Sequence, residues 1–322
     1  LCYFKCKDEG SIMPKLLTVI VPCYNEEENI KYFYEEFCKN DAYFLKHAIM
    51  YQLIFVDDGS TDGTVTEIKN LHQKDKRVKL LSFSRNFGKE AAIYAGLQHA
   101  SGNLVAIMDV DLQDPPSLLP QMIDEIFAGA DQVVARRTAR EGEPRIRSWF
   151  AKLFYKILNC FSQTKVMDGA RDYRVMNTRV VEAVLSVTEK NRFSKGIFSW
   201  VGFNTKWVAY ENVQRKYGQT KWSFWQLWKY AFDGLTAYST ALLSMSSFVG
   251  VLFCLISFLM IIFVVIRKLI FGDPTAGWPS LVCIILLASG LQLLSIGVIG
   301  QYLAKTYMEV KNRPVYIVKE KL

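Results

Sequence analysis

One short segment, residues 105–116 with the sequence VAIMDVDLQDPP, constrains the fold of this chain most strongly. Its first part is an apolar run typical of a buried strand, and Pro115 and Pro116 mark that the strand has ended. Asp109 and Asp111 lie two positions apart, so in extended backbone both carboxylates point to the same side. Such a pair is suited to bind Mg²⁺ or Mn²⁺ beside a diphosphate. A surface turn rich in Asp and Pro is the alternative for this segment alone.

Two segments upstream repeat this pattern of an apolar strand followed by a polar cluster. Residues 17–28 read LTVIVPCYNEEE, an apolar run that ends in proline and an acidic helix start. Residues 51–64 read YQLIFVDDGSTDGT, an apolar run that breaks into a turn with helix-capping residues before a helix predicted over residues 65–71. Strands that alternate with helices predict a parallel sheet, in which ligands bind at the carboxyl ends of the strands. All three polar clusters fall at such ends.

The three clusters also resemble a known family. The segments VPCYNEEENI, VDDGSTDGT and DVDLQDPP are similar to the nucleotide-sugar half of the family 2 glycosyltransferases, over about residues 16–217. The resemblance implies an α/β catalytic domain of the GT-A type, which has a Rossmann-like, mostly parallel sheet. We assign this domain to residues 13–221. Residues 1–12 are treated as an N-terminal extension, because Met13 directly precedes the first predicted strand.

Long apolar stretches are concentrated near the end of the chain. Residues 240–266 and 276–304 contain no charged side chain, and each exceeds the roughly 20 apolar residues that cross a bilayer as a helix. We therefore predict two C-terminal transmembrane helices joined by a short hairpin and followed by a tail, residues 305–322. The tail contains five Lys and Arg residues, whereas the hairpin contains only Arg267 and Lys268. This distribution places the catalytic domain and the tail on the cytoplasmic side of a cell membrane.

Cysteine usage and net charge agree with this placement. The seven cysteines form neither a CxxC pair nor a zinc-binding spacing, which favours reduced cytosolic thiols over a disulfide framework. The net charge of +8 is accompanied by no nucleic-acid recognition motif. We attribute it to contact with an anionic lipid bilayer and with phosphate-bearing substrates, and we expect no nucleic-acid partner.

Two segments next to the predicted spans have aromatic and aliphatic residues at helical spacing and basic residues on the other face. They are residues 145–161 and residues 222–239, the latter immediately before the first span. Amphipathic core helices give the same pattern. The Trp, Lys and Arg content beside a membrane anchor favours helices that lie in the bilayer interface, which would hold the catalytic domain close to lipid headgroups.

The segments between these helices resemble the membrane-bound polyprenyl-phosphate branch of the family. That branch has a GxxDFR-like acceptor motif and an RxxGxSK motif, to which residues 168–174 and 215–221 are similar. Tyr173 stands where Phe is common, and Thr220 stands where Ser is common. The resemblance implies transfer of a hexose from a UDP-sugar to a polyprenyl phosphate such as undecaprenyl phosphate, with inversion at the anomeric carbon.

The resemblance also implies roles for residues on the donor side. A metal and diphosphate group is expected from Asp109, Asp111 and Gln113, of which Asp111 is taken as catalytic. A divalent cation there would stabilise the negative charge that develops on the leaving UDP. Contacts to the nucleotide-sugar are expected from residues of the three clusters, namely Pro22, Tyr24, Glu26, Asp57 and Asp109.

On the acceptor side, the resemblance points to one carboxylate and a set of basic residues. Asp172 occupies the position of the family's proposed base. A phosphate monoester has a second pKa of about 6 and is already anionic near neutral pH, so a base is less necessary than for a hydroxyl acceptor. The acceptor phosphate is expected to bind Arg174, Arg192, Arg215 and Lys221, with Arg215 ranked first.

Several alternatives share part of this pattern. A processive polysaccharide synthase has similar N-terminal motifs, but it carries a QxxRW signature and this chain has no Arg-Trp dipeptide. A non-catalytic membrane scaffold is expected to lose the metal-site carboxylates, and these are all present. Mn²⁺-dependent UDP binding distinguishes that scaffold from an enzyme.

The donor sugar and the oligomeric state are open at this point. GDP-mannose is the alternative donor. The motifs do not choose between the donors, because the shape of the pocket rather than the spelling of the motifs determines the sugar. We favour glucose, with N-acetylglucosamine next, and expect the product to serve cell-wall or surface-glycan modification. Small residues in the second predicted span permit helix association and hence a homo-oligomer: Gly290, Ser295, Gly297 and Gly300.

Overall fold

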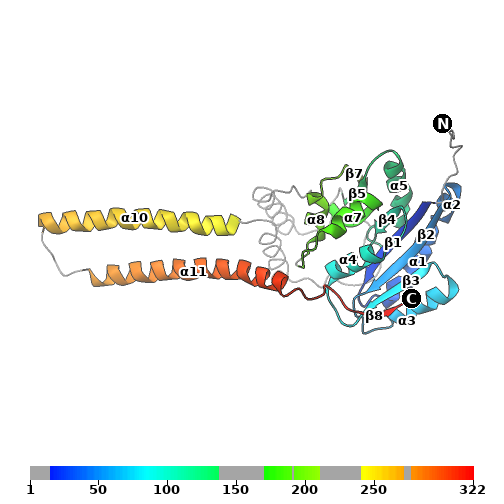
Figure 1. The fold of residues 1–322 in the computed structure, drawn as a ribbon, viewed down its shortest axis with the longest axis horizontal. Coiled ribbons are helices and arrows are strands. Elements are labelled where there is room, and N and C mark those ends of the chain that lie inside the picture. The colour runs from blue at the N-terminus through cyan, green and yellow to red at the C-terminus, as the bar shows by residue number, and fades with distance from the viewer. Residues whose placement is uncertain (1–14, 138–169, 191, 211–240, 272–276) are drawn as a thin grey trace, which may run out of the picture. The chain divides into compact units, whose positions relative to one another are not determined.

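A computed structural model describes residues 15–137, 170–190, 192–210, 241–271 and 277–322 (Figure 1). The chain divides into two compact units. Of the described residues, the first unit contains 15–137, 170–190, 192–210 and 314–322, and the second contains 241–271 and 277–313. The predicted interfacial helices over residues 145–161 and 222–239 lie outside the described residues, as does the N-terminal extension.

The first unit is built on one eight-stranded sheet with the order β7-β5-β6-β4-β1-β2-β3-β8. Its central strands β4, β1, β2 and β3 run parallel, as do β5 and β7. Antiparallel pairs join β6 to β4 and β5, and join β8 to β3. The mostly parallel α/β sheet predicted from the alternation of strands and helices is therefore confirmed. The strands are β1 Lys15–Cys23, β2 Ile49–Asp57, β3 Val78–Phe83, β4 Leu104–Ile107, β5 Gln132–Arg137, β6 Ala170–Asn177, β7 Thr205–Tyr210 and β8 Val318–Lys321.

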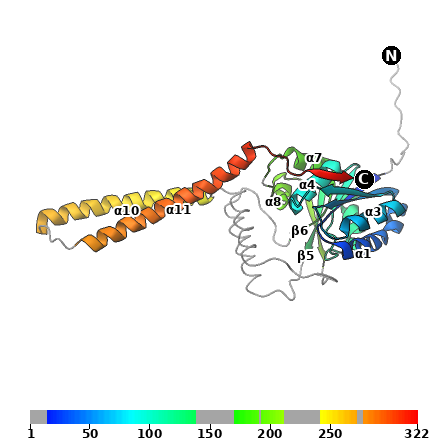
Figure 2. The ribbon, with the colours of Figure 1, turned by 90° about the horizontal axis from the view of Figure 1, so that it is seen from below.

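Helices cover both faces of this sheet (Figure 2). One face packs against α1, α2, α3 and α5 in a continuous apolar core that includes Phe33, Phe37 and Ile68. The other face is covered by α4 and α7, and α4 approaches β1 so closely that a Cβ at Gly96 would lie 2.2 Å from Ile20 Cγ2. The helices of this unit are α1 Glu27–Cys38, α2 Asp41–Lys46, α3 Thr64–Lys74, α4 Lys89–His99, η1 Pro116–Leu118, α5 Leu119–Phe127, α7 Thr178–Ser186 and α8 Ser194–Trp200.

The C-terminal residues differ from the separate tail that the sequence suggested. Residues Val318–Lys321 form β8 and pair antiparallel with β3 at the edge of the sheet. Tyr316, just before β8, stacks on Phe83 with 5.0 Å between ring centroids, and its hydroxyl donates to Gln98 Oε1 at 2.9 Å. Lys69 forms an ion pair with Glu320 at 2.7 Å. The last residues of the chain are thus part of the first unit.

The described part of the second unit consists of two long helices, α10 Ala241–Phe271 and α11 Trp278–Val310. Both continue beyond the uncharged stretches, so the helices end later than the predicted spans. Among the described residues, only Leu287–Val310 is long and apolar enough by itself to cross a membrane, and Phe248–Met260 in α10 is a shorter apolar segment. The prediction of two transmembrane helices is therefore not confirmed by this criterion.

Candidate active site

Strand register brings two distant carboxylates together. Asp109 follows the end of β4, and Asp172 lies on β6. Because β6 runs antiparallel to β4 with Ile107 opposite Arg174, the residue two positions after Ile107 comes opposite the residue two positions before Arg174. Those residues are Asp109 and Asp172, which are 63 positions apart in the sequence. The predicted donor motif and the predicted acceptor motif therefore meet where β4 ends and β6 begins.

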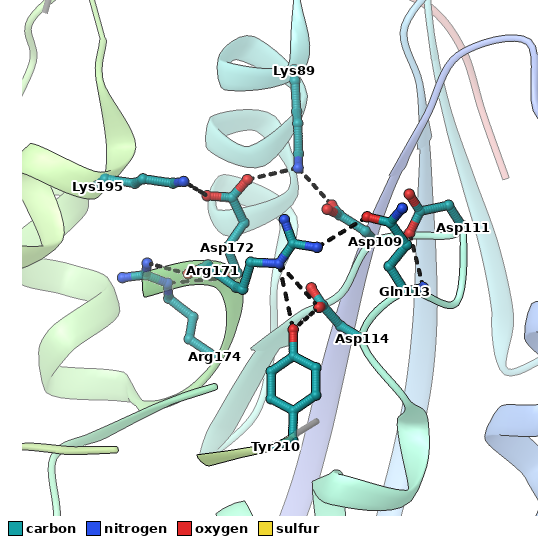
Figure 3. Close-up of polar contacts among 10 residues, drawn as sticks. All are labelled: Lys89, Asp109, Asp111, Gln113, Asp114, Arg171, Asp172, Arg174, Lys195 and Tyr210. Atoms are coloured by element: carbon teal, nitrogen blue, oxygen red, sulfur yellow. Dashed lines mark hydrogen bonds and ion pairs between the residues drawn. The ribbon is translucent and has the colours of Figure 1, made fainter. Parts of the chain in front are cut away.

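Lys89, the first residue of α4, bridges these two carboxylates (Figure 3). Its Nζ lies 2.6 Å from Asp109 Oδ1 and 2.7 Å from Asp172 Oδ2. Burial acts to lower the pKa of Lys89, but the two carboxylates outweigh burial and raise the pKa above its ordinary value. The side chain is therefore a permanent cation between the two motifs.

Asp172 has a second cationic neighbour. Lys195 Nζ on α8 lies 4.0 Å from Asp172 Oδ1. Burial acts to raise the pKa of Asp172, whereas Lys89 and Lys195 lower it, and the net result is a pKa well below the ordinary range. A carboxylate that holds its proton so weakly is a poor general base, and its charge is suited to orient cations instead.

A second polar network holds the loop after Asp109 in place. Arg171 donates to Gln113 Oε1 at 3.0 Å and to Asp114 Oδ1 at 3.2 Å. Tyr210, at the end of β7, donates its hydroxyl to the same oxygen of Asp114. Burial raises the pKa of Asp114, and the charge of Arg171 and the bond from Tyr210 act against that rise. The metal-motif loop is thus tied to both β6 and β7.

The carboxylates at this strand end fit Mg²⁺ or Mn²⁺. Among the described residues no three His, Cys, Asp or Glu side chains form a closed metal cage. Magnesium is commonly held by only one or two carboxylates with substrate phosphates and water supplying the other ligands. The pair Asp109 and Asp111 is compatible with such a site, which stays a prediction. Gln113 has another partner, since its side-chain oxygen accepts from Arg171. Asp111 Oδ1 accepts the Gln113 backbone N–H at 3.2 Å, which orients that carboxylate.

The predicted nucleotide residues gather at the ends of β1 and β2. Pro22 is buried within β1, and Tyr24 just after the strand is 43% exposed. Glu26 is partly exposed, accepts a hydrogen bond from Asn29, and donates its backbone N–H to Thr64. Exposed aromatic and carboxylate groups at this edge agree with a nucleotide contact, which stays a prediction.

Asp57 differs from the others because its side chain faces the interior. It is 1% exposed. Its Oδ1 accepts the Ser60 backbone N–H at 3.0 Å, and its Oδ2 accepts the Ser82 hydroxyl at 2.7 Å. These bonds tie β2 to its following turn and to β3. In this arrangement Asp57 fixes the turn after β2 from within.

Two of the four predicted acceptor-binding cations are also directed inward. Arg174 is 3% exposed, donates to the backbone oxygens of Arg171 and Asp172, and lies over the Phe198 ring at 3.7 Å. Arg192 is 9% exposed and donates to the backbone oxygens of Val184 and Val187 at the end of α7. Arg215 and Lys221 lie outside the described residues.

Five residues of the site were not predicted from the sequence: Lys89, Asp114, Arg171, Lys195 and Tyr210. Lys89 follows the end of β3 at the start of a helix, so the strand-end rule that found the aspartates applied to it as well. Arg171 lies inside the GxxDFR-like motif that was recognised for its neighbours, and Lys195 lies three positions after Arg192. Tyr210 carries no local signal, because only the parallel pairing of β7 with β5 brings it to Asp114.

Comparison with known proteins agrees with this geometry. Residues 18–185 match the description "Glycosyl transferase family 2". The SfII prophage-derived bactoprenol glucosyl transferase of Shigella flexneri is 42% identical over 94% of this chain and 97% of that protein. A prophage bactoprenol glucosyl transferase homolog of Escherichia coli K12 is 40% identical over 94% and 98%. An uncharacterized glycosyltransferase of Synechocystis is 37% identical over 94% and 95%. The chain therefore belongs to glycosyl transferase family 2.

Proposed function

We propose that this protein is an inverting, metal-dependent glycosyltransferase that moves glucose from a UDP-sugar to undecaprenyl phosphate at the cytoplasmic face of a cell membrane. The observation that carries the proposal is the meeting of Asp109 and Asp172 at Lys89. It occurs in a chain that is 42% identical, over 94% of its length, to a protein named bactoprenol glucosyl transferase. The product would be a lipid-linked sugar for cell-wall or surface-glycan modification.

The chemistry assigned to the site is a displacement at the anomeric carbon. A phosphate oxygen of the acceptor forms a bond to C1 while the bond from C1 to the UDP oxygen breaks, and the electron pair leaves with UDP. Asp109 and Asp111 are assigned to a divalent cation, which when bound would stabilise charge on the leaving diphosphate. The acceptor phosphate is already anionic, so Asp172 need not remove a proton. The low pKa of Asp172 supports this orienting role.

Chain topology supports two membrane spans. The chain enters α10 after strands of the sheet, and it returns to the same sheet as β8 after α11. Because both ends of this excursion lie in one folded sheet, the chain must cross a membrane an even number of times. If Leu287–Val310 crosses, another segment crosses too. The 31-residue helix α10 exceeds the roughly 20 residues that a span needs and is assigned to that second crossing.

The metal and donor assignment is tested by replacing Asp111 with Asn in the full-length chain in nanodiscs. We expect UDP to bind the wild type in the presence of Mn²⁺ and to bind Asp111→Asn at least about ten-fold more weakly, because one anionic ligand of the cation is lost. Formation of glucosyl lipid from UDP-glucose should be lost in parallel. Glu182→Gln, an exposed carboxylate on α7, is the control. Equal Mn²⁺-dependent UDP binding by Asp111→Asn would contradict the assignment.

A further inference from the structure

The cations paired with the carboxylate of Asp172 differ from those expected to bind the acceptor phosphate. The guanidinium groups of Arg174 and Arg192 are buried and donate to backbone carbonyl oxygens. The side chains of Lys89 and Lys195 are 44% and 23% exposed, and both ammonium groups are directed at Asp172. Lysine is a common phosphate ligand because its ammonium group offers three donors as a compact charge.

Lys89 is held at a fixed place by the donor half of the site. Asp58, in the cluster that follows β2, accepts the backbone N–H of Phe87 at 2.6 Å and that of Gly88 at 2.9 Å. Gly88 has φ +98°, a backbone conformation that favours glycine. These contacts fix the turn that leads into α4, so the first residue of the helix projects toward the strand end. The position of Lys89 therefore depends on Asp58, which belongs to the cluster after β2 where the nucleotide is proposed to bind.

Lys195 is held by a neighbour of Lys89. Glu90, the second residue of α4, accepts the backbone N–H of Ser194 at 2.8 Å and also accepts the Ser194 hydroxyl. Ser194 is the first residue of α8 and directly precedes Lys195. The two ammonium groups thus reach Asp172 from two helices whose starts are joined by one carboxylate. This arrangement presents two positive charges around one orienting carboxylate.

We propose that Lys89, supported by Lys195, binds the phosphate of the lipid acceptor, an inference that rests on the polyprenyl-phosphate function proposed above. Lys89 shares Asp109 with the cation and diphosphate site. A divalent cation held by Asp109 would leave Lys89 with Asp172 as its carboxylate partner. A donor of the Lys89 ammonium group would then be available to the acceptor phosphate. Lys89 is thus the residue through which donor binding prepares the acceptor site, and acceptor binding follows donor binding.

The test compares Lys89→Gln with the wild type as full-length chains in nanodiscs. Binding of undecaprenyl phosphate is measured against undecaprenol, which lacks the phosphate, with and without UDP and Mn²⁺. In the wild type, UDP with Mn²⁺ should strengthen binding of the phosphate lipid several-fold. Lys89→Gln should lose this gain and bind undecaprenyl phosphate about ten- to a hundred-fold more weakly, as expected for loss of a charged hydrogen bond. Affinity for UDP should change by less than about three-fold.

Matched variants separate this role from a structural one. Lys89→Arg, which keeps the charge, should recover most of the acceptor affinity. Lys31→Gln on α1, whose side chain is 69% exposed, should bind both ligands as the wild type does. If Lys89→Gln does not fold, Lys195→Gln supplies the test, with an expected rise in acceptor KM of about three- to ten-fold and an unchanged donor KM.

Three outcomes would overturn the inference. The first is that Lys89→Gln binds undecaprenyl phosphate as tightly as the wild type does. The second is that Lys89→Gln loses UDP binding while its acceptor binding stays intact. The third applies if Lys89→Gln does not fold, and it is an unchanged acceptor KM in Lys195→Gln. Failure of the proposed function gives a different result. In that case the wild type would bind undecaprenyl phosphate through Lys89 but form no glycolipid with any donor. Transfer by the wild type together with normal acceptor binding by Lys89→Gln would leave the function intact and remove only the assignment of Lys89.

Discussion

Asp114 and Asp172 lie in the same site, yet their surroundings shift their pKa values in opposite directions. Burial dominates at Asp114 and raises its pKa, whereas Lys89 and Lys195 dominate at Asp172 and lower its pKa. Asp114 is suited to accept structural hydrogen bonds from Tyr210 and Arg171. Asp172 is suited to stay ionised and to position cations. Two carboxylates of one chemical type therefore have different partners and oppositely shifted pKa values.

Two buried tyrosines near Asp114 provide a matched test of these contacts. The Tyr173 hydroxyl has no hydrogen-bond partner within the described residues, whereas the Tyr210 hydroxyl donates to Asp114. Tyr173→Phe should leave the free energy of unfolding unchanged or raise it by up to about 1 kcal/mol, because an unpaired buried hydroxyl is removed. Tyr210→Phe should lower it by about 1–3 kcal/mol. Thermal unfolding in detergent checks both, and a larger loss in Tyr173→Phe than in Tyr210→Phe would contradict this account.

The sequence predicted the positions of the acidic residues in the fold better than it predicted the orientation of the basic side chains. Asp109 and Asp111 were located because three polar clusters each follow an apolar strand, and ligands bind at such strand ends in a parallel sheet. Arg174 and Arg192 were assigned to a phosphate because Arg174 lies in the GxxDFR-like motif and Arg192 lies between that motif and the RxxGxSK-like motif. A guanidinium group can also satisfy backbone carbonyls or stack on a ring, and both residues do so here. Motif position does not distinguish these uses.

At the level of elements, β8 is one of the strands that the sequence did not indicate. Its four residues read VKEK, too short and too charged for the alternation that marks a half-buried strand. It pairs only at one edge, against β3, so charged side chains remain in contact with water. The late end of α11 has a similar cause. Hydropathy marks where apolar sequence stops, whereas the helix continues through charged residues to Val310.

The attachment of β8 can be tested through Tyr316. Tyr316→Ala removes the stack on Phe83 and should lower the free energy of unfolding by about 1–2 kcal/mol. Tyr316→Phe keeps the ring and loses only the bond to Gln98, so its effect should stay below about 1 kcal/mol. Glu320→Gln, which removes a surface ion pair, should cost no more than about 1 kcal/mol. Thermal unfolding is the measurement, and equal effects of Ala and Phe at this position would show that stacking does not hold β8.

At the scale of the whole molecule, the return of the chain to its own sheet constrains the topology. Hydropathy alone could not predict that the chain returns to the sheet after the two long helices, because β8 has no hydropathy signal. Once β8 is placed, the catalytic domain and the C-terminus must lie on the same side of any membrane that α11 crosses. The parallel centre of the sheet followed from the sequence, whereas the antiparallel pairing that brings Asp172 to Asp109 required the fold.

The most direct test of the central claim is the product formed by the intact chain in nanodiscs. Undecaprenyl phosphate is supplied with equal amounts of UDP-glucose, UDP-N-acetylglucosamine and GDP-mannose in the presence of Mn²⁺. The mass of the lipid product is then measured by mass spectrometry, and the released nucleotide is identified. We expect undecaprenyl phosphate carrying one hexose, with release of UDP. Release of GDP, a polymer, or unmodified lipid with all three donors present would contradict the account.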